Sequence, residues 1–82
     1  SKMFTKNELA QLRRALAKYT KNSYESISIK TDLSRTTISK FFNGKPVKSE
    51  NALKIFSTTV DLIREGRQDF EDMQQTIRTL DL

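Results

Sequence analysis

Cysteine and histidine are both absent from this chain of 82 residues. Without them the protein cannot form disulfides, and it cannot build the Cys/His sites that hold structural zinc. It also lacks the commonest general base and a thiol nucleophile, so we expect no enzymatic activity, no cofactor and no metal site. These absences favour a binding protein over a catalyst.

Glycine and proline are scarce, with two glycines and one proline, and few runs alternate in the manner of strands. This composition predicts helices throughout. The length suits one domain, and we expect an all-α, compact bundle of about five helices. No run of about 18 apolar residues is present to cross a membrane. The first residues lack the apolar stretch of a signal peptide, so we expect a cytoplasmic protein.

The first helix is predicted from its start signal and its apolar spacing. Thr5 and Glu8 have the spacing of a capping box, in which each residue bonds the backbone of the other. The apolar residues that follow recur at i, i+3, i+7 and i+10, which places them on one helical face. They are Leu9, Leu12, Leu16 and Tyr19.

Serine residues in front of apolar periodic segments predict where three later helices begin. Ser23 precedes a short helix at residues 24–30, Ser34 precedes one that ends near Phe42, and Ser49 precedes a fourth. Asn43-Gly44 predicts a left-handed stop for the helix that ends near Phe42. Gly66 is expected to interrupt the fourth helix, or at least to loosen it, and a last helix is expected beyond it. The residues expected to form the core of these helices and of the turn between them are Ile27, Leu33, Ile38, Phe41, Leu53, Phe56, Val60 and Ile63.

Residues 24–43 meet the steric demands of a helix-turn-helix. The first helix of such a motif needs an inward apolar residue followed by a small one, and Ile27 and Ser28 supply them. The turn needs a residue that tolerates positive φ, which Asp32 does better than most residues. Leu33 then serves as the buried turn residue. The inward residues of the second helix are Ile38 and Phe41.

The segment Leu33-Ser34-Arg35-Thr36-Thr37-Ile38-Ser39-Lys40-Phe41-Phe42-Asn43-Gly44 resembles the lambda-repressor-like DNA-binding domains, also called Cro/cI or XRE-type. The family pattern is an apolar residue, Ser, three polar residues, Ile, Ser, a basic residue, two apolar residues, Asn and Gly. The resemblance extends over roughly residues 8–63. Within the helix-turn-helix, Asp32 stands where glycine is usual and Ser28 where alanine is usual.

The resemblance implies that a reading helix at residues 35–43 enters the major groove of double-stranded DNA. Arginine suits bidentate hydrogen bonds to guanine, and threonine offers both a methyl and a hydroxyl group. The residues that would face the bases are Arg35, Thr36, Thr37, Ser39 and Lys40. Those that would contact phosphates are Tyr24, Ser34, Asn43, Lys45 and Lys48. Tyr24 departs from the family, in which glutamine is common at that position.

The charge distribution favours this interpretation. Residues 1–58 contain 12 Lys/Arg and four acids, whereas residues 59–82 contain three arginines and six acids. No acid stands between Asp32 and Glu50, although that stretch has four bases. The alternative is that these basic residues only form a solvent-exposed helix face, but such a face usually contains both positive and negative charges. We therefore expect a transcriptional regulator of the repressor or antitoxin type, free of any membrane.

The C-terminal segment has a narrow apolar stripe on an acidic helix. Its members are Phe70, Met73, Ile77 and Leu80. We divide the chain into a helix-turn-helix DNA-binding core at residues 1–64 and an amphipathic acidic helix at residues 67–82, for docking or dimerisation. The stripe either folds back onto the first helix or pairs with a second copy in a homodimer. A third possibility is a module that keeps the fold but works by binding a protein partner through this helix.

Overall fold

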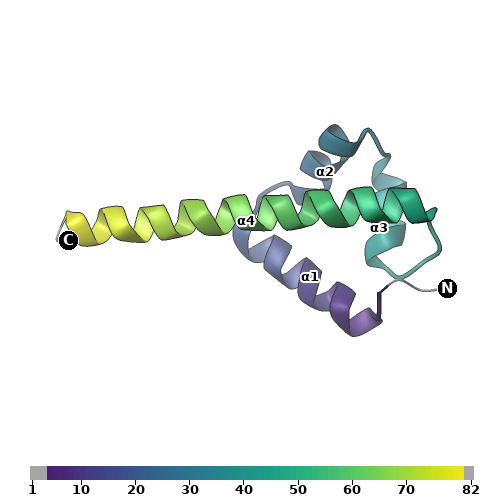
Figure 1. Cartoon of the computed structure of the whole chain (residues 1–82), viewed down its shortest axis with the longest axis horizontal. Helices are drawn as coiled ribbons and strands as arrows, with labels where there is room; N and C mark the ends of the chain where they lie inside the picture. The colour runs from purple at the N-terminus through teal and green to yellow at the C-terminus, as the bar shows by residue number, and fades with distance from the viewer. Residues whose placement is uncertain (1–3, 81–82) are drawn as a thin grey trace.

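The computed structural model describes residues 4–80, and these residues form helices and connecting loops without a strand. The helices are α1 (Lys6–Tyr19), α2 (Ser23–Thr31), α3 (Arg35–Phe42) and α4 (Ser49–Thr79). The expected all-α class is confirmed. The expected number of helices, about five, was wrong, because one long helix replaces the last two (Figure 1).

The predicted start of α1 is confirmed. The backbone N–H of Thr5 donates to Glu8 Oε1 at 2.8 Å, and the backbone N–H of Glu8 donates to Thr5 Oγ1 at 3.1 Å. Two of the otherwise unpaired N–H groups at the helix end are satisfied in this way. Leu9 and Leu16 are buried on the face that α1 turns to the body.

The second helix begins differently from the prediction. Asn22, not Ser23, precedes the helix, with a left-handed backbone (φ 51°) and no capping hydrogen bond from its side chain. Ser23 is the first helical residue, so its hydroxyl does not serve as the predicted cap. The end of α2 agrees with the prediction, since Asp32 has φ 60° and its N–H donates to the carbonyl of Ser28.

The third helix has both of its predicted end signals. Ser34 Oγ accepts from the N–H of Thr37 at 3.2 Å and so caps the first turn. At the other end Gly44 has φ 74°, and its N–H donates to the carbonyl of Phe41. The N–H of Lys45 donates to the carbonyl of Lys40 at 2.9 Å, which completes a Schellman ending.

Helix α4 runs without a break through Gly66, so the predicted interruption there was wrong. A Cβ atom at Gly66 would overlap the carbonyl oxygen of Tyr19 and would lie 2.8 Å from Tyr19 Cβ. This glycine therefore allows the end of α1 to approach α4 closely. The start of α4 also differs, because Lys48 and not Ser49 is the residue in front of the helix, and no side chain caps it.

The buried face of α4 is rotated from the predicted one. Ala52, Ile55 and Thr59 are buried, whereas Leu53 is 54% exposed. The other predicted members, Phe56, Val60 and Ile63, are half-buried. Small side chains at this face let α1 and α2 pack closely against α4. The buried hydroxyl group of Thr59 has a hydrogen-bond partner, because it donates to the carbonyl of Ile55 at 2.7 Å.

All four helices contribute to a single core, in which Ile27, Ile38 and Ile55 are fully buried. Phe42, which the sequence analysis did not place inside, is buried beside Phe41 with the two rings edge to face. Phe4 packs against Phe41 and Phe56 and closes the same end of the core. Within the described chain, no helix has both the length and the apolar character that a membrane crossing requires.

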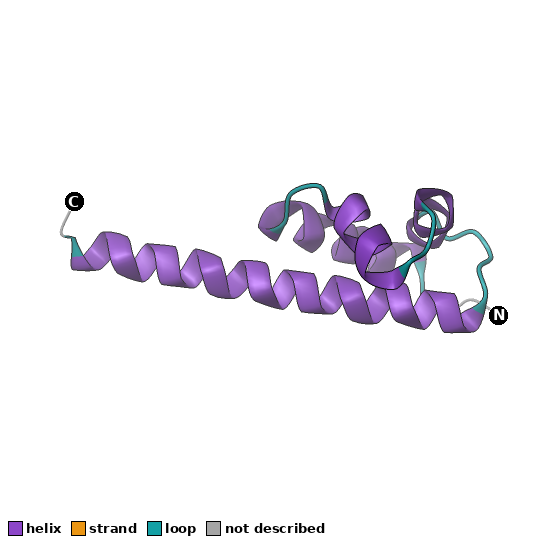
Figure 2. Ribbon diagram, turned by 90° about the horizontal axis from the view of Figure 1, so that it is seen from above, coloured by secondary structure: helices purple, strands orange, loops and turns teal. Residues whose placement is uncertain are grey.

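The last part of α4 projects from the body as an arm, which we define as residues 67–80 (Figures 1 and 2). A helix of 31 residues is about 46 Å long at 1.5 Å per residue. One face of the arm is apolar and exposed by 47–60%. Its members are Phe70, Met73, Ile77 and Leu80. Only Phe70 meets α1, where its ring lies 6.2 Å from that of Tyr19, and the rest of the stripe does not fold back onto that helix, so that alternative was wrong. Residues 81–82 of the predicted 67–82 helix lie outside the described residues.

Candidate nucleic-acid interface

Helix α3 buries one side and presents the other to solvent. Ile38, Phe41 and Phe42 fix the inner side in the core. The predicted base-facing residues occupy the remaining positions, and of these Arg35, Thr36 and Lys40 are exposed while Thr37 and Ser39 are half-buried. The structure thus gathers the five residues on the outer side of one short helix.

Short polar contacts hold part of this outer surface. The hydroxyl oxygens of Ser34 and Thr37 lie 3.0 Å apart, and Asn43 Nδ2 donates to Ser39 Oγ at 3.1 Å. The Ser34 hydroxyl already serves as the cap of α3, so a phosphate would share it with the helix end. Arg35, Thr36 and Lys40 take no part in these contacts and are exposed.

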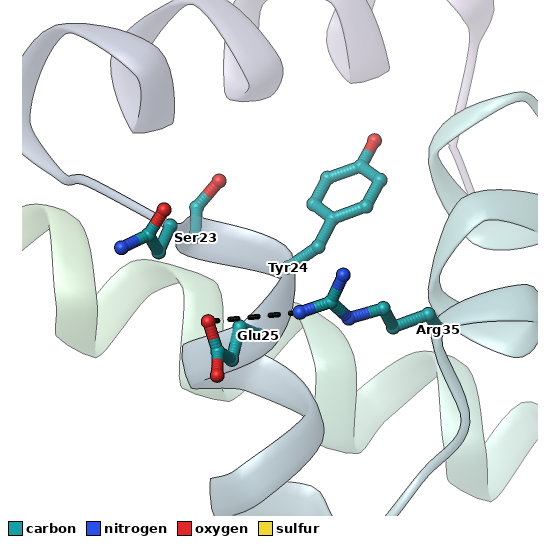
Figure 3. Close-up of a pocket in the computed structure, with 5 residues that line it drawn as sticks. Ser23, Tyr24, Glu25 and Arg35 are labelled. Carbon is teal, nitrogen blue, oxygen red and sulfur yellow. Dashed lines mark ion pairs between the residues drawn. The ribbon is translucent and has the colours of Figure 1, made fainter.

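An acidic residue that the sequence analysis did not select lies beside Arg35. Glu25 Oε2 is 3.6 Å from Arg35 Nη2, with the two side chains 54% and 67% exposed. Figure 3 shows the guanidinium of Arg35 reaching from α3 toward the Glu25 carboxylate on α2. The absence of an acid between residues 32 and 50 therefore does not make the surface free of acids, because α2 packs against α3 and brings Glu25 alongside.

A shallow open depression of about 290 Å³ surrounds this ion pair. Its lining comes from the first turn of α2 and the start of α3, and consists of Asn22, Ser23, Tyr24, Glu25 and Arg35. Because Asn22 makes no capping hydrogen bond from its side chain, the first N–H groups of α2 have no side-chain partner there. Such groups at a helix N-terminus are suited to bind a phosphate oxygen.

Tyr24 contributes to the packing of α2 on α3. Its ring stacks on Phe42 with centroids 5.2 Å apart and an interplanar angle of 12°. The residue is half-buried, so only part of it is available to a ligand. A tyrosine at this position therefore braces the two helices, whatever its hydroxyl group contacts.

The remaining predicted phosphate contacts lie after α3. Asn43, Lys45 and Lys48 are all exposed. The glycine ending of α3 sets the path of this loop, and the half-buried Val47 packs against the core between the two lysines. Both lysines are thus attached to an anchored segment. Among residues 4–80 no group of His, Cys, Asp or Glu is arranged to hold a metal ion.

No protein-family model, curated protein or solved structure matches the chain.

Proposed function

We propose that this protein binds double-stranded DNA through α3, as a transcriptional regulator of the repressor or antitoxin type. In this proposal α2, the turn at Asp32 and α3 form a lambda-repressor-like helix-turn-helix. The observation that carries the proposal is the two-sided nature of α3, which is anchored by Ile38 and Phe41 and presents Arg35 and Lys40 outward.

Two flanking features support the same binding mode. The uncapped first turn of α2 lies on one side of Arg35, and the loop with Lys45 and Lys48 follows the other end of α3. Contacts from both to phosphates would set the register of α3 in the groove without selecting a sequence. The base-facing residues would then provide the sequence preference.

The experiment that tests the proposal is selection from a random duplex library at two salt concentrations. We expect one enriched motif at both salts. Arg35→Ala should then weaken binding to that motif by about 1–3 kcal/mol if the arginine pairs with a guanine, and Lys40→Ala should also weaken it. Arg78→Ala is the matched control, because it removes the same charge from the exposed arm.

Lys45→Ala is expected to act differently, because a phosphate contact is common to all sequences. It should weaken binding to every duplex alike and reduce the dependence on salt by about one counterion. The proposal is wrong if no motif is enriched and binding disappears at moderate salt. It is also wrong if Arg35→Ala and Lys40→Ala leave the biological activity intact, an outcome that favours the protein-binding module.

We further propose that the arm pairs with the arm of a second copy, so that two reading helices bind paired half-sites. The exposed residues Phe70, Met73, Ile77 and Leu80 are spaced by three, four and three, as at the a and d positions of a coiled coil. Half-sites about one helical turn apart are typical of dimeric helix-turn-helix proteins. Four partly exposed side chains make a small interface, so we expect a weak dimer.

Molar mass measured across a concentration series tests this pairing. We expect a shift from monomer toward dimer at high concentration, and the double variant M73Q/I77Q should remain monomeric. Gln75→Ala on the same exposed arm is the control and should dimerise like the wild type. A wild type that stays monomeric at every concentration contradicts the homodimer and leaves the arm as a surface for a different protein.

A further inference from the structure

We infer that Glu25 is a positioning residue that orients Arg35 and thereby increases the sequence discrimination of the DNA interface. This inference rests on the proposed function of α3. The observation behind it is the ion pair of Glu25 with Arg35, which is the single ion pair among residues 4–80 and lies on the surface proposed to meet DNA.

The carboxylate of Glu25 is attached to a rigid frame. Helices α2 and α3 share the fully buried Ile27 and Ile38, and the Tyr24 ring stacks on Phe42. The Ser28 hydroxyl also donates to the carbonyl of Leu33 at 2.6 Å, which ties α2 to the turn. Glu25 is therefore held in a defined place relative to α3, although its own side chain is half exposed.

The geometry leaves Arg35 able to bind a base while it is paired. A guanidinium has five N–H donors, and the approach to Glu25 involves Nη2 at 3.6 Å, an ion-pair distance and not a hydrogen bond. Enough donors remain for a bidentate contact with guanine. A long arginine side chain has many rotamers, and a fixed carboxylate beside it reduces the number that must be lost on binding.

The negative charge of Glu25 also lowers the affinity of the protein for DNA of the wrong sequence. A carboxylate near the phosphate backbone is repelled, which lowers affinity for every duplex, whereas a correctly placed Arg35 raises affinity only for the right base. Glu25 should therefore lower nonspecific binding more than specific binding. An exposed ion pair of this kind contributes little to the stability of the fold, so its main effect would be on DNA recognition.

A purely structural role for Glu25 is the competing explanation. It stands in the first turn of α2, where an acid interacts favourably with the helix dipole and partly offsets the missing side-chain cap. Glu50 has the same type of position in the first turn of α4, where a side-chain cap is likewise missing. Glu50→Gln is thus a matched control for both the charge and the helix-end effect.

The test compares Glu25→Gln with Glu50→Gln, using the selected motif and a random duplex of equal length. We expect Glu25→Gln to raise affinity for the random duplex about three- to tenfold and to lower the ratio of specific to nonspecific affinity about tenfold. Glu50→Gln should leave that ratio unchanged. In the double variant E25Q/R35A, base preference should match that of Arg35→Ala alone, because Glu25 acts through Arg35.

The outcomes separate the two levels of the proposal. If the wild type selects a motif but Glu25→Gln and Glu50→Gln change the ratio equally, Glu25 has only a charge or helix-end role and the inference is wrong. If Glu25→Gln still alters base preference when Arg35 is absent, the positioning role is likewise wrong. If the wild type selects no motif, the DNA-binding function fails and the inference fails with it.

Discussion

The two halves of α4 have similar apolar periodicity and opposite surroundings. Residues 49–66 pack against the body, and the arm at residues 67–80 extends into solvent (Figure 2). The packed half uses small residues, Ala52, Thr59 and Gly66, at seven-residue intervals along its inner face. Small side chains allow neighbouring helices to approach, whereas the arm presents large apolar residues that stay about half exposed, and of these only Phe70 meets another side chain of the described stretch, Tyr19.

An amphipathic stripe in a sequence therefore indicates that a helix face makes a contact, but it does not identify the surface that covers that face. The arm is helical because the packed half supplies a helix already formed, and adding residues to it costs less than nucleating a new helix. Local side-chain bonds such as Gln68 Nε2 to Asp72 Oδ1 at 2.9 Å add little. The stability of the arm should therefore depend on its attachment to the body and on whatever covers its apolar face.

The largest expected effect comes from Ile55, in the packed half of α4. Ile55 is fully buried, so Ile55→Ala should lower the free energy of unfolding by about 2–5 kcal/mol through lost burial and an incompletely filled cavity. Leu53→Ala is the matched control two residues away, and its 54% exposure predicts a much smaller loss. Urea unfolding measures both. A larger loss for Leu53→Ala than for Ile55→Ala would mean that the buried face of α4 is the one predicted from the sequence.

The next effect concerns Gly66, at the junction between the two halves. In an exposed helix interior Gly→Ala stabilises by up to about 1 kcal/mol. Here the added Cβ would overlap the Tyr19 carbonyl, so Gly66→Ala should destabilise the protein by about 1–3 kcal/mol. Arg67→Ala, at the exposed next position, should change stability little. A stabilising Gly66→Ala would show that α1 and α4 are not in close contact.

The smallest effects are expected in the arm. The Phe70 ring meets Tyr19 edge to face with centroids 6.2 Å apart, so Phe70→Ala should lower the free energy of unfolding of the dilute monomer by about 0.5–1.5 kcal/mol. Ile77→Ala lies further along the exposed arm and should leave the dilute monomer nearly unchanged. Thermal unfolding at low concentration measures both variants. A large loss for Ile77→Ala would mean that the arm is covered by its own chain.

Some residues of the proposed DNA interface could be predicted from the sequence and others could not. Arg35, Thr36 and Lys40 could be selected from the motif, because a helix with inward residues at Ile38 and Phe41 leaves these positions outward. Glu25 could not, since it is ten residues away along the chain and its role depends on how α2 packs on α3. The presence of an acid in the preceding helix was visible, but its distance from Arg35 was not.

The features that could be predicted from the sequence depend on interactions between residues close together in the chain. Thr5 with Glu8, Ser34, Asp32 and Gly44 each act within a few residues, through side-chain caps or a tolerance of positive φ, and each acts as predicted. The all-helical class follows from composition and periodicity, which are likewise local properties.

The role of Gly66, the buried face of α4 and the partner of Arg35 depend instead on how the helices pack. Each of these features depends on which helix faces pack against each other. The residues involved are too far apart in the chain for a local spacing rule to predict their contact. A glycine in a helix weakens it when exposed and permits close packing when another backbone lies against it, as Tyr19 does here. Residues 4–80 therefore form four helices, whereas local spacing and Gly66 predicted about five.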